Sequence, residues 1–234
     1  LQLVTPPAAT AASTGLVISE FYGNGGNAGA VRNADFIELY NAGSAVVTLN
    51  GLSLQYGSTT GSFGGNGTLV FALSGTLAPN QYFLVHLNPD SRTTPVAGDM
   101  SGNSIDLAGG SGKIAVVTGT SPLLCGSTSA TAPAPCSDAQ KERFVDLVGY
   151  GTGANMWEGA TRAPGGSAAL AVFRKQDGAQ DTGNNGADFV AAAPAPRNSL
   201  TTPVVIGPLE TLALPTALAV DEEATVTLTA LATD

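Results

Sequence analysis

Two segments decide the fold of this chain: Leu16-Val-Ile-Ser-Glu-Phe-Tyr22 and Ala34-Asp-Phe-Ile-Glu-Leu-Tyr-Asn41, which a glycine-rich loop joins. A strand followed by such a loop also begins dinucleotide-binding folds, but there a helix must follow the glycines, because its N-terminus holds the pyrophosphate. Here only Ala30-Val-Arg-Asn33 separates the loop from the second segment. A parallel crossover needs roughly ten or more residues. The sequence therefore excludes the nucleotide site and predicts two antiparallel or facing strands.

Short runs of β-type residues, separated by turn-rich segments, continue along the chain. They are residues 52–56, 68–73, 81–87, 113–118, 144–150 and 168–173. In the second strand Phe36, Glu38 and Tyr40 alternate with Ile37 and Leu39, so the two sets face opposite sides. Strands at this spacing, without alternating helices, predict an all-β fold built as an antiparallel β-sandwich.

Composition limits the kinds of function. Hydrophobic residues make up 43% of the 234 residues and charged residues 12%, and the net charge is −9. Only three lysines occur, Lys113, Lys141 and Lys175, so direct nucleic-acid binding through a basic groove is not expected. No apolar run approaches the roughly 20 residues that a transmembrane helix needs.

The chain divides into three parts by composition. Residues 1–14 are expected to be a flexible leader, residues 15–199 the β-sandwich, and residues 200–234 a linker and part of a second small β-module. All 8 Phe, all 5 Tyr and the single Trp precede position 190, and the segment 191–199 resembles a linker. We expect a fragment of a longer multi-domain protein. The alternative is a C-terminal hairpin packed on the main domain. One helical turn is expected at residues 138–143, after the second cysteine.

Taken together, several segments resemble the bacterial branch of the lamin-tail domain family. They are residues 17–27, 33–41, 49–56, 77–85, 145–151, 181–189 and 194–199, in this order. The resemblance implies an immunoglobulin-like β-sandwich that is not itself catalytic. In secreted bacterial proteins such domains commonly precede a nuclease or phosphatase of the endonuclease/exonuclease/phosphatase superfamily, or other surface modules. The cysteine-bracketed loop near residues 120–140 departs from the compact family pattern.

Three functions follow as hypotheses. The first is a secreted or cell-surface accessory domain without a catalytic site, which contacts other domains of its chain or cell-surface proteins. The alternative is the N-terminal part of an extracellular nuclease or phosphatase whose catalytic domain lies outside these residues. The third is a carbohydrate- or lipid-binding module that uses exposed aromatic side chains near Trp157, a candidate exposed contact.

Calcium is the candidate cofactor, because calcium prefers six to eight oxygen ligands on a flexible loop. The segment 177–188 offers five such side chains: Asp177, Asp181, Asn184, Asn185 and Asp188. The alternative is a polar turn whose Asp and Asn side chains cap backbone groups.

Asn33 and Asp35 are a second candidate oxygen-rich metal site. Glu20 and Glu38 lie among apolar residues in the middle of strands, where an unpaired carboxylate is costly. We expect them to bond to backbone amides or to pair with Arg or Lys. His86, the single histidine, is expected in a strand with a satisfied imidazole.

The two cysteines, Cys125 and Cys136, flank a polar, proline-bearing loop. Their spacing is wrong for a redox CxxC motif, and a zinc site lacks further ligands. A disulfide is the expected state and implies an oxidising compartment, whereas two buried free thiols are the alternative.

Overall fold

The computed structural model describes residues 15–65, 67–87, 97–102, 104–131 and 133–202. By contacts the chain divides into two units, Leu1–Val204 and Val205–Asp234, and every described residue belongs to the first. The predicted leader and nearly all of the predicted second module therefore lie outside the described residues.

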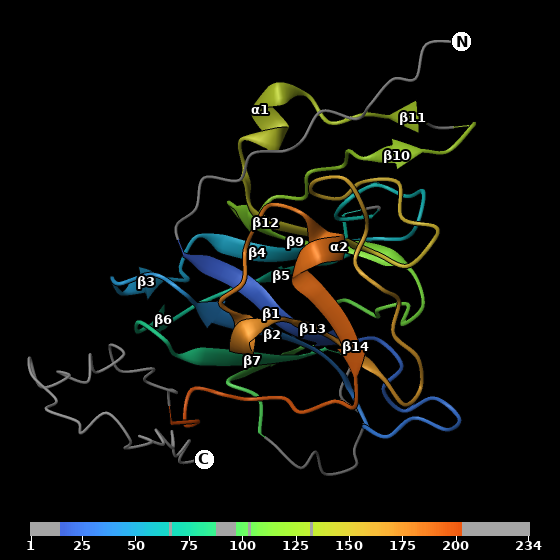
Figure 1. The fold of residues 1–234 in the computed structure, drawn as a ribbon. Coiled ribbons are helices and arrows are strands. Elements are labelled where there is room, and N and C mark those ends of the chain that lie inside the picture. The colour runs from blue at the N-terminus through green and yellow to red at the C-terminus, as the bar shows by residue number, and fades with distance from the viewer. Residues whose placement is uncertain (1–14, 66, 88–96, 103, 132, 203–234) are drawn as a thin grey trace, which may run out of the picture. The chain divides into compact units, whose positions relative to one another are not determined.

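Strands dominate the described part of the chain (Figure 1). The longer strands are β1 (Leu16–Tyr22), β2 (Asp35–Asn41), β4 (Leu52–Gly57), β7 (Tyr82–Leu87), β9 (Gly112–Thr118), β12 (Phe144–Tyr150), β13 (Ala171–Arg174) and β14 (Phe189–Ala192). The shorter strands are β3 (Val47–Thr48), β5 (Val70–Ala72), β6 (Thr76–Leu77), β8 (Met100–Gly102), β10 (Ser127–Thr128) and β11 (Pro133–Ala134). The helices are α1 (Asp138–Lys141), the 3-10 turn η1 (Gln176–Gly178) and α2 (Asn185–Asp188).

Two sheets pack face to face as an immunoglobulin-like β-sandwich. Within the described residues, one sheet has the order β14-β13-β1-β2-β7-β8 and the other the order β12-β9-β4-β5. The predicted pairing of the first two strands is confirmed, because β1 and β2 are antiparallel neighbours. One pair departs from the predicted antiparallel pattern: β8 runs parallel to β7.

The core lies between the two sheets, and the alternation in β2 shows how the sequence fills it. Ile37 and Leu39 belong to the main core cluster. Phe36 and Tyr40 belong to two smaller clusters on the other face of the six-stranded sheet, which we call the outer face. Glu38 lies between these clusters and is also fully buried. The outer face is therefore covered by other parts of the chain.

The segment 191–199, which resembles a linker in composition, is attached to the sandwich. Residues 189–192 form β14, which pairs with β13 at the edge of the six-stranded sheet. Residues 193–199, which we call the strap, then cross the outer face (the orange-red segment after β14 in Figure 1). The composition misled because alanine and proline carry little β-type pattern, while the strap is held by polar contacts.

The predicted helical turn is present as α1, and its sequence explains where it begins. Ser137 caps the helix, since its side chain accepts a hydrogen bond from the Gln140 N–H and the Gln140 side chain accepts one from the Ser137 N–H. This reciprocal capping box satisfies two backbone donors that the helix leaves unpaired. The polar loop before it contains the short hairpin β10–β11, which the sequence did not predict.

Candidate functional site

The strap is bound to the sandwich through carboxylates from successive strands. Glu20 in β1 accepts a hydrogen bond from the Ala195 N–H at 3.0 Å, and Glu38 in β2 accepts one from the Arg197 N–H at 2.5 Å. Asp99, before β8, accepts one from the Ser199 N–H at 3.0 Å. Every second residue of the strap is thus held by a carboxylate as the strap passes from strand to strand.

The sequence of the strap explains this spacing. Successive N–H groups of an extended chain point to opposite sides, so residues 195, 197 and 199 present theirs to the sheet. Pro194 precedes the first of these residues and Pro196 lies between the first two, and proline has no N–H that would need a partner. Alternating prolines therefore suit a segment whose inner face is bonded and whose outer face has no neighbouring strand.

Arg197 is the principal side-chain anchor. Its guanidinium donates to Glu38 Oε1 at 2.9 Å and to Tyr82 Oη at 2.8 Å, and it stacks over the Tyr82 ring at 3.8 Å. It also donates to the exposed Asp177 at 3.3 Å. Loss of this cation would leave the Glu38 carboxylate buried without an opposite charge, which is costly. The expectation that Glu38 pairs with Arg or Lys is confirmed.

Glu20 and Glu38 form a buried acidic pair beneath the strap. The two residues are direct neighbours in the β1–β2 register, and both are fully buried. Burial and the adjacent Glu38 raise the pKa of Glu20 to about 8, so Glu20 carries a proton at neutral pH. Among the described residues, Glu20 Oε2 has no hydrogen-bond partner, and neither does the buried Nε of Arg32.

A second network joins the two sheets around Arg174. This buried side chain donates to both oxygens of Asp146, at 3.0 and 2.8 Å, and to the Ile18 carbonyl at 2.9 Å. Asp146 belongs to β12 in the opposite sheet and also accepts the Ile18 N–H at 2.6 Å. The register of β1 shifts between Ile18 and Glu20, and this bulge turns the Ile18 N–H away from its sheet. Arg174 and Asp146 therefore fasten one sheet to the other.

The predicted calcium ligands are divided between these networks. Asp181 pairs with Arg174 at 3.2 Å. Asp188 is fully buried and accepts hydrogen bonds from the Thr182 N–H and hydroxyl. Asp177 instead pairs with Arg197. The loop thus brings Asp181 and Asp188 together around a cation of the protein itself.

The two asparagines of this loop bond to backbone groups. Asn185 is fully buried, accepts the Gly149 N–H at 2.9 Å and donates to the Leu147 carbonyl at 3.0 Å. Its amide thereby pairs with the open edge of β12 as a neighbouring strand would. Asn184 accepts from the Thr161 N–H at 3.3 Å. Within the described ranges no three Asp, Glu, His or Cys side chains form a group suited to a metal.

At the second predicted oxygen-rich site, Asp35 bonds to backbone amides. Its carboxylate accepts the Gly25 N–H and the Leu107 N–H, each at 2.7 Å. The structure brings Asp106 beside it, a neighbour that the sequence did not indicate. Burial and the nearby Asp106 raise the pKa of Asp35 to about 7. Asn33 also has an interaction partner.

The disulfide joins Cys125 to Cys136 with an S–S distance of 2.00 Å. Cys125 is buried in a small apolar cluster with Phe63 and Phe144. The hairpin between the cysteines is also attached to the sandwich, because Asn155 donates to the Gly126 carbonyl and to the Thr128 hydroxyl. The segment between the two cysteines is therefore attached to the sandwich.

Lys113 holds the loops beneath this hairpin. Its buried ammonium donates to the carbonyls of Ser58 and Gly61, at 3.1 and 2.6 Å, and to Asn155 Oδ1 at 2.5 Å. Burial lowers the pKa of Lys113 to about 8. All three ammonium donors thus have acceptors, and the side chain ties the loop after β4 to the segment around Asn155.

Trp157 is partly buried, and the Arg162 guanidinium stacks over its ring at 4.0 Å. His86 lies in β7 and is buried, as expected for a strand residue, and burial lowers the pKa of its imidazole.

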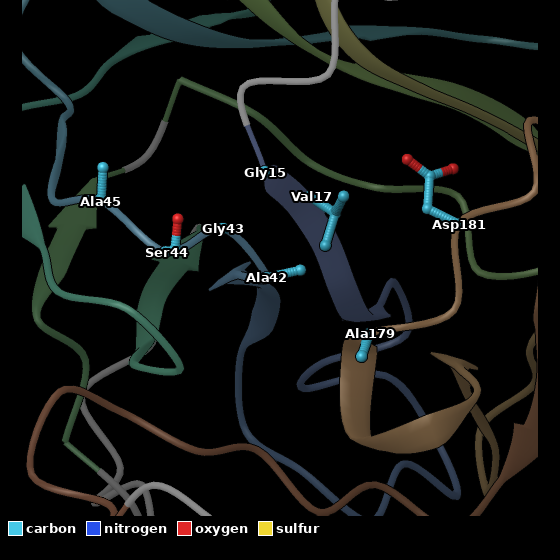
Figure 2. A pocket seen from close by; sticks show the side chains of 8 residues that line it. All are labelled: Gly15, Val17, Ala42, Gly43, Ser44, Ala45, Ala179 and Asp181. Carbon is cyan, nitrogen blue, oxygen red and sulfur yellow. The ribbon is translucent and has the colours of Figure 1, made fainter. Parts of the chain in front are cut away.

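A hollow of about 540 Å³ opens beside the start of β1 (Figure 2). Small residues line it, from the start of β1, from the segment after β2 and from the end of η1, and Asp181 is the ionisable side chain among them. Asp181 is already engaged by Arg174. This lining offers neither a histidine nor a second carboxylate for acid–base chemistry.

Among the described helices, none has the length and apolar character to cross a membrane. No curated protein matches the chain. Among solved structures, it is similar to a DUF4876 family protein from Bacteroides thetaiotaomicron VPI-5482, with a TM-score of 0.48 and 14% sequence identity, over 81% of this chain and 74% of that chain.

The comparison with protein families gives a match to the Lamin Tail Domain over residues 9–152, more than half of the chain. The matched region includes β1, β2 and the strands of the second sheet that form most of the core. This protein belongs to the Lamin Tail Domain family.

Proposed function

We propose that this domain is a non-catalytic accessory module of a secreted or cell-surface protein, and that it holds the chain that follows it in a fixed direction. One observation carries the proposal: carboxylates on β1, on β2 and before β8 bind residues 195, 197 and 199 of the strap. A chain anchored at three successive points cannot pivot freely where it leaves the sandwich.

Further contacts hold residues 198 and 199 on the sandwich, and a local turn continues from them to residue 201. Asn198 donates to the Ala97 carbonyl at 2.9 Å, and its own N–H is accepted by the Thr201 hydroxyl at 3.2 Å. Gln81, before β7, donates to the Ser199 carbonyl at 3.0 Å. The exit of the chain is thus fixed by β7 and by the connection to β8. This is the arrangement expected of a spacer that orients a neighbouring module.

The disulfide supports the proposed extracellular location, because disulfides persist in oxidising compartments. The buried polar networks support a structural role, since their carboxylates are committed to cations or backbone amides within the domain.

The test is the mobility of the exit segment, measured by backbone ¹⁵N relaxation on the complete 234-residue chain. Residues 195–202 are expected to show order parameters close to those of β1 and β2, of about 0.85. Arg197→Ala is expected to lower them below about 0.6 while β1 and β2 keep theirs. Lys141→Ala, on exposed α1 away from the strap, is the matched control. Free-linker mobility of residues 195–202 in the unmodified chain would refute the proposal.

The absence of catalysis is tested separately. The same protein, supplied with magnesium or calcium, is expected to leave phosphodiester and phosphomonoester substrates uncleaved. Turnover that survives purification and disappears on substitution of residues in this domain would show that the domain is catalytic.

A further inference from the structure

Glu20 lies directly beneath the strap and has one carboxylate oxygen without a partner among the described residues. We propose that Glu20 is a proton-operated latch: protonated Glu20 keeps residues 195–197 docked on the sheet, and ionisation of Glu20 loosens them. This inference rests on the proposed function, because it describes how the anchoring of the exit segment is regulated.

The charged groups that face Glu20 are unbalanced. Glu38 lies opposite it on β2. Arg197 approaches from the strap, and Arg32 from the loop before β2. On the remaining side its register partner in β13 is the uncharged Phe173. Arg197 already donates to Glu38, Tyr82 and Asp177. An ionised Glu20 would therefore be a second buried anion beside a guanidinium that already balances the charge of Glu38.

Ionised Glu20 needs donors for both of its oxygens, because an unsatisfied buried charge is costly. Oε1 has the Ala195 N–H, but Oε2 has none among the described residues. Water is one source of donors, and because Glu20 is fully buried and bonded to the strap, water reaches Oε2 through a local opening at this contact.

Arg32 is the other source, and its use has the same consequence. The Arg32 Nη2 group now donates to the Pro194 carbonyl at 2.6 Å. A movement of this guanidinium towards Glu20 would break that bond and release the start of the strap. Both responses to ionisation therefore weaken the same docked segment. Because the pKa of Glu20 is about 8, the change falls in the mildly alkaline range.

Trypsin cleavage after Arg197 measures the docking, because a protease needs an extended, undocked segment around its cleavage site. The reference is cleavage after Lys141 in α1, which lies at the opposite end of the molecule from the strap (Figure 1). The ratio of the two rates removes the pH dependence of the protease. We expect this ratio to rise about tenfold between about pH 7 and about pH 9, as the ionised fraction of Glu20 does.

Glu20→Gln mimics the protonated side chain at every pH. The variant is expected to keep the low ratio throughout, to within about twofold, whereas Glu38→Gln should raise the ratio at every pH because Arg197 loses its buried partner. A constant ratio in the unmodified protein overturns the latch. So does a Glu20→Gln variant that follows the unmodified protein.

A second measurement keeps the test independent of the variants' folding. In the unmodified chain the ¹³C carboxyl resonance of Glu20 and the amide resonance of Ala195 are expected to titrate with one common midpoint. Midpoints more than about one pH unit apart, beyond the scatter expected for one site, overturn the proposal. The proposed function fails on a different result, mobile residues 195–202 at neutral pH, so the two failures are distinguishable.

Discussion

At the scale of single residues, three buried or half-buried cations organise the polar parts of this domain. Arg174 joins the two sheets, Arg197 holds the strap, and Lys113 gathers loops under the hairpin. Each is surrounded by oxygen acceptors, which offset the cost of removing a charge from water. Removal of one cation leaves buried acceptors or carboxylates without a partner. The free energy of unfolding therefore falls more than it does when an exposed ion pair is lost.

The Arg174 pair gives the first prediction. Arg174→Met leaves the Asp146 carboxylate buried without its cation and is expected to lower the free energy of unfolding by about 3–5 kcal/mol. The double variant Arg174→Met/Asp146→Asn should recover part of this loss, because the asparagine side chain that replaces Asp146 is neutral and still accepts the Ile18 N–H. Urea unfolding curves measure both. Equal destabilisation in the single and double variants would contradict the charge explanation.

Glu20 gives a prediction for global stability. Its folded-state pKa of about 8 lies above the ordinary value of 4.5. The folded state therefore holds the proton more tightly, and stability falls as the pH rises from about 4.5 through about 8. Glu20→Gln removes this dependence and is expected to be more stable than the unmodified protein by on the order of 2 kcal/mol at about pH 9. Thermal melting at about pH 5 and about pH 9 gives the comparison, and a parallel loss of stability in both proteins would exclude Glu20 as its source.

At the scale of elements, two additions are attached to the sandwich. The cysteine-bracketed hairpin is held by a disulfide and by Asn155, and the strap is held by carboxylates and Arg197. The hairpin has only two residues in each strand, and such a short hairpin is not stable alone. Its order depends on the disulfide, on Asn155 and on the apolar contacts of Cys125.

The disulfide gives the element-scale prediction. Cys125→Ala/Cys136→Ala is expected to lose on the order of 2–3 kcal/mol, the value for a closed loop of this length. Amide hydrogen exchange should accelerate in residues 126–135 and stay slow in β1, β2 and β9. Mass measurement after alkylation without reductant should label no thiol in the unmodified protein. Two labelled thiols would show that the bond does not form.

The elements also show what sequence reasoning can reach. Runs such as β1, β9 and β12 were predictable, because their apolar side chains fill the core and leave a local pattern. The strap was not, because its partners lie far away in sequence. Glu20 and Ala195 are separated by 175 residues, and Glu38 and Arg197 by 159. The need of Glu20 and Glu38 for partners was evident from their positions in apolar strands, but the identity of the partners required the fold. Alternating prolines were the available local signal.

At the scale of the whole molecule, the strap covers part of the outer face of the six-stranded sheet, and the disulfide hairpin lies at the opposite end of the described residues (Figure 1). This places the fixed exit of the chain on one side and the insertion on the other. The described part of the chain thus has two separate surfaces, one at the strap and one at the disulfide hairpin.

Calcium dependence is a prediction for the whole domain. An ion bound by the loop 177–188 competes with Arg174 for Asp181 and Asp188. If calcium is a ligand, added calcium raises the melting temperature and a chelator lowers it, and Asp181→Asn abolishes the difference. Asp138→Asn, in exposed α1, is the matched control. An unchanged melting temperature in chelator would show that calcium does not stabilise this domain.

The arrangement of the strap has a mechanical consequence. Its anchors act in series along the chain, with Ser199 on Asp99 first, Arg197 on Glu38 next and Ala195 on Glu20 last. Tension applied beyond residue 202 and directed away from the sheet would load these anchors one at a time, from the outermost inwards. Each rupture would lengthen the chain by a short step and dissipate work before any force reached the strands of the core. The strap would therefore detach from the sheet under load and bind again when the load is removed, while the sandwich stays folded.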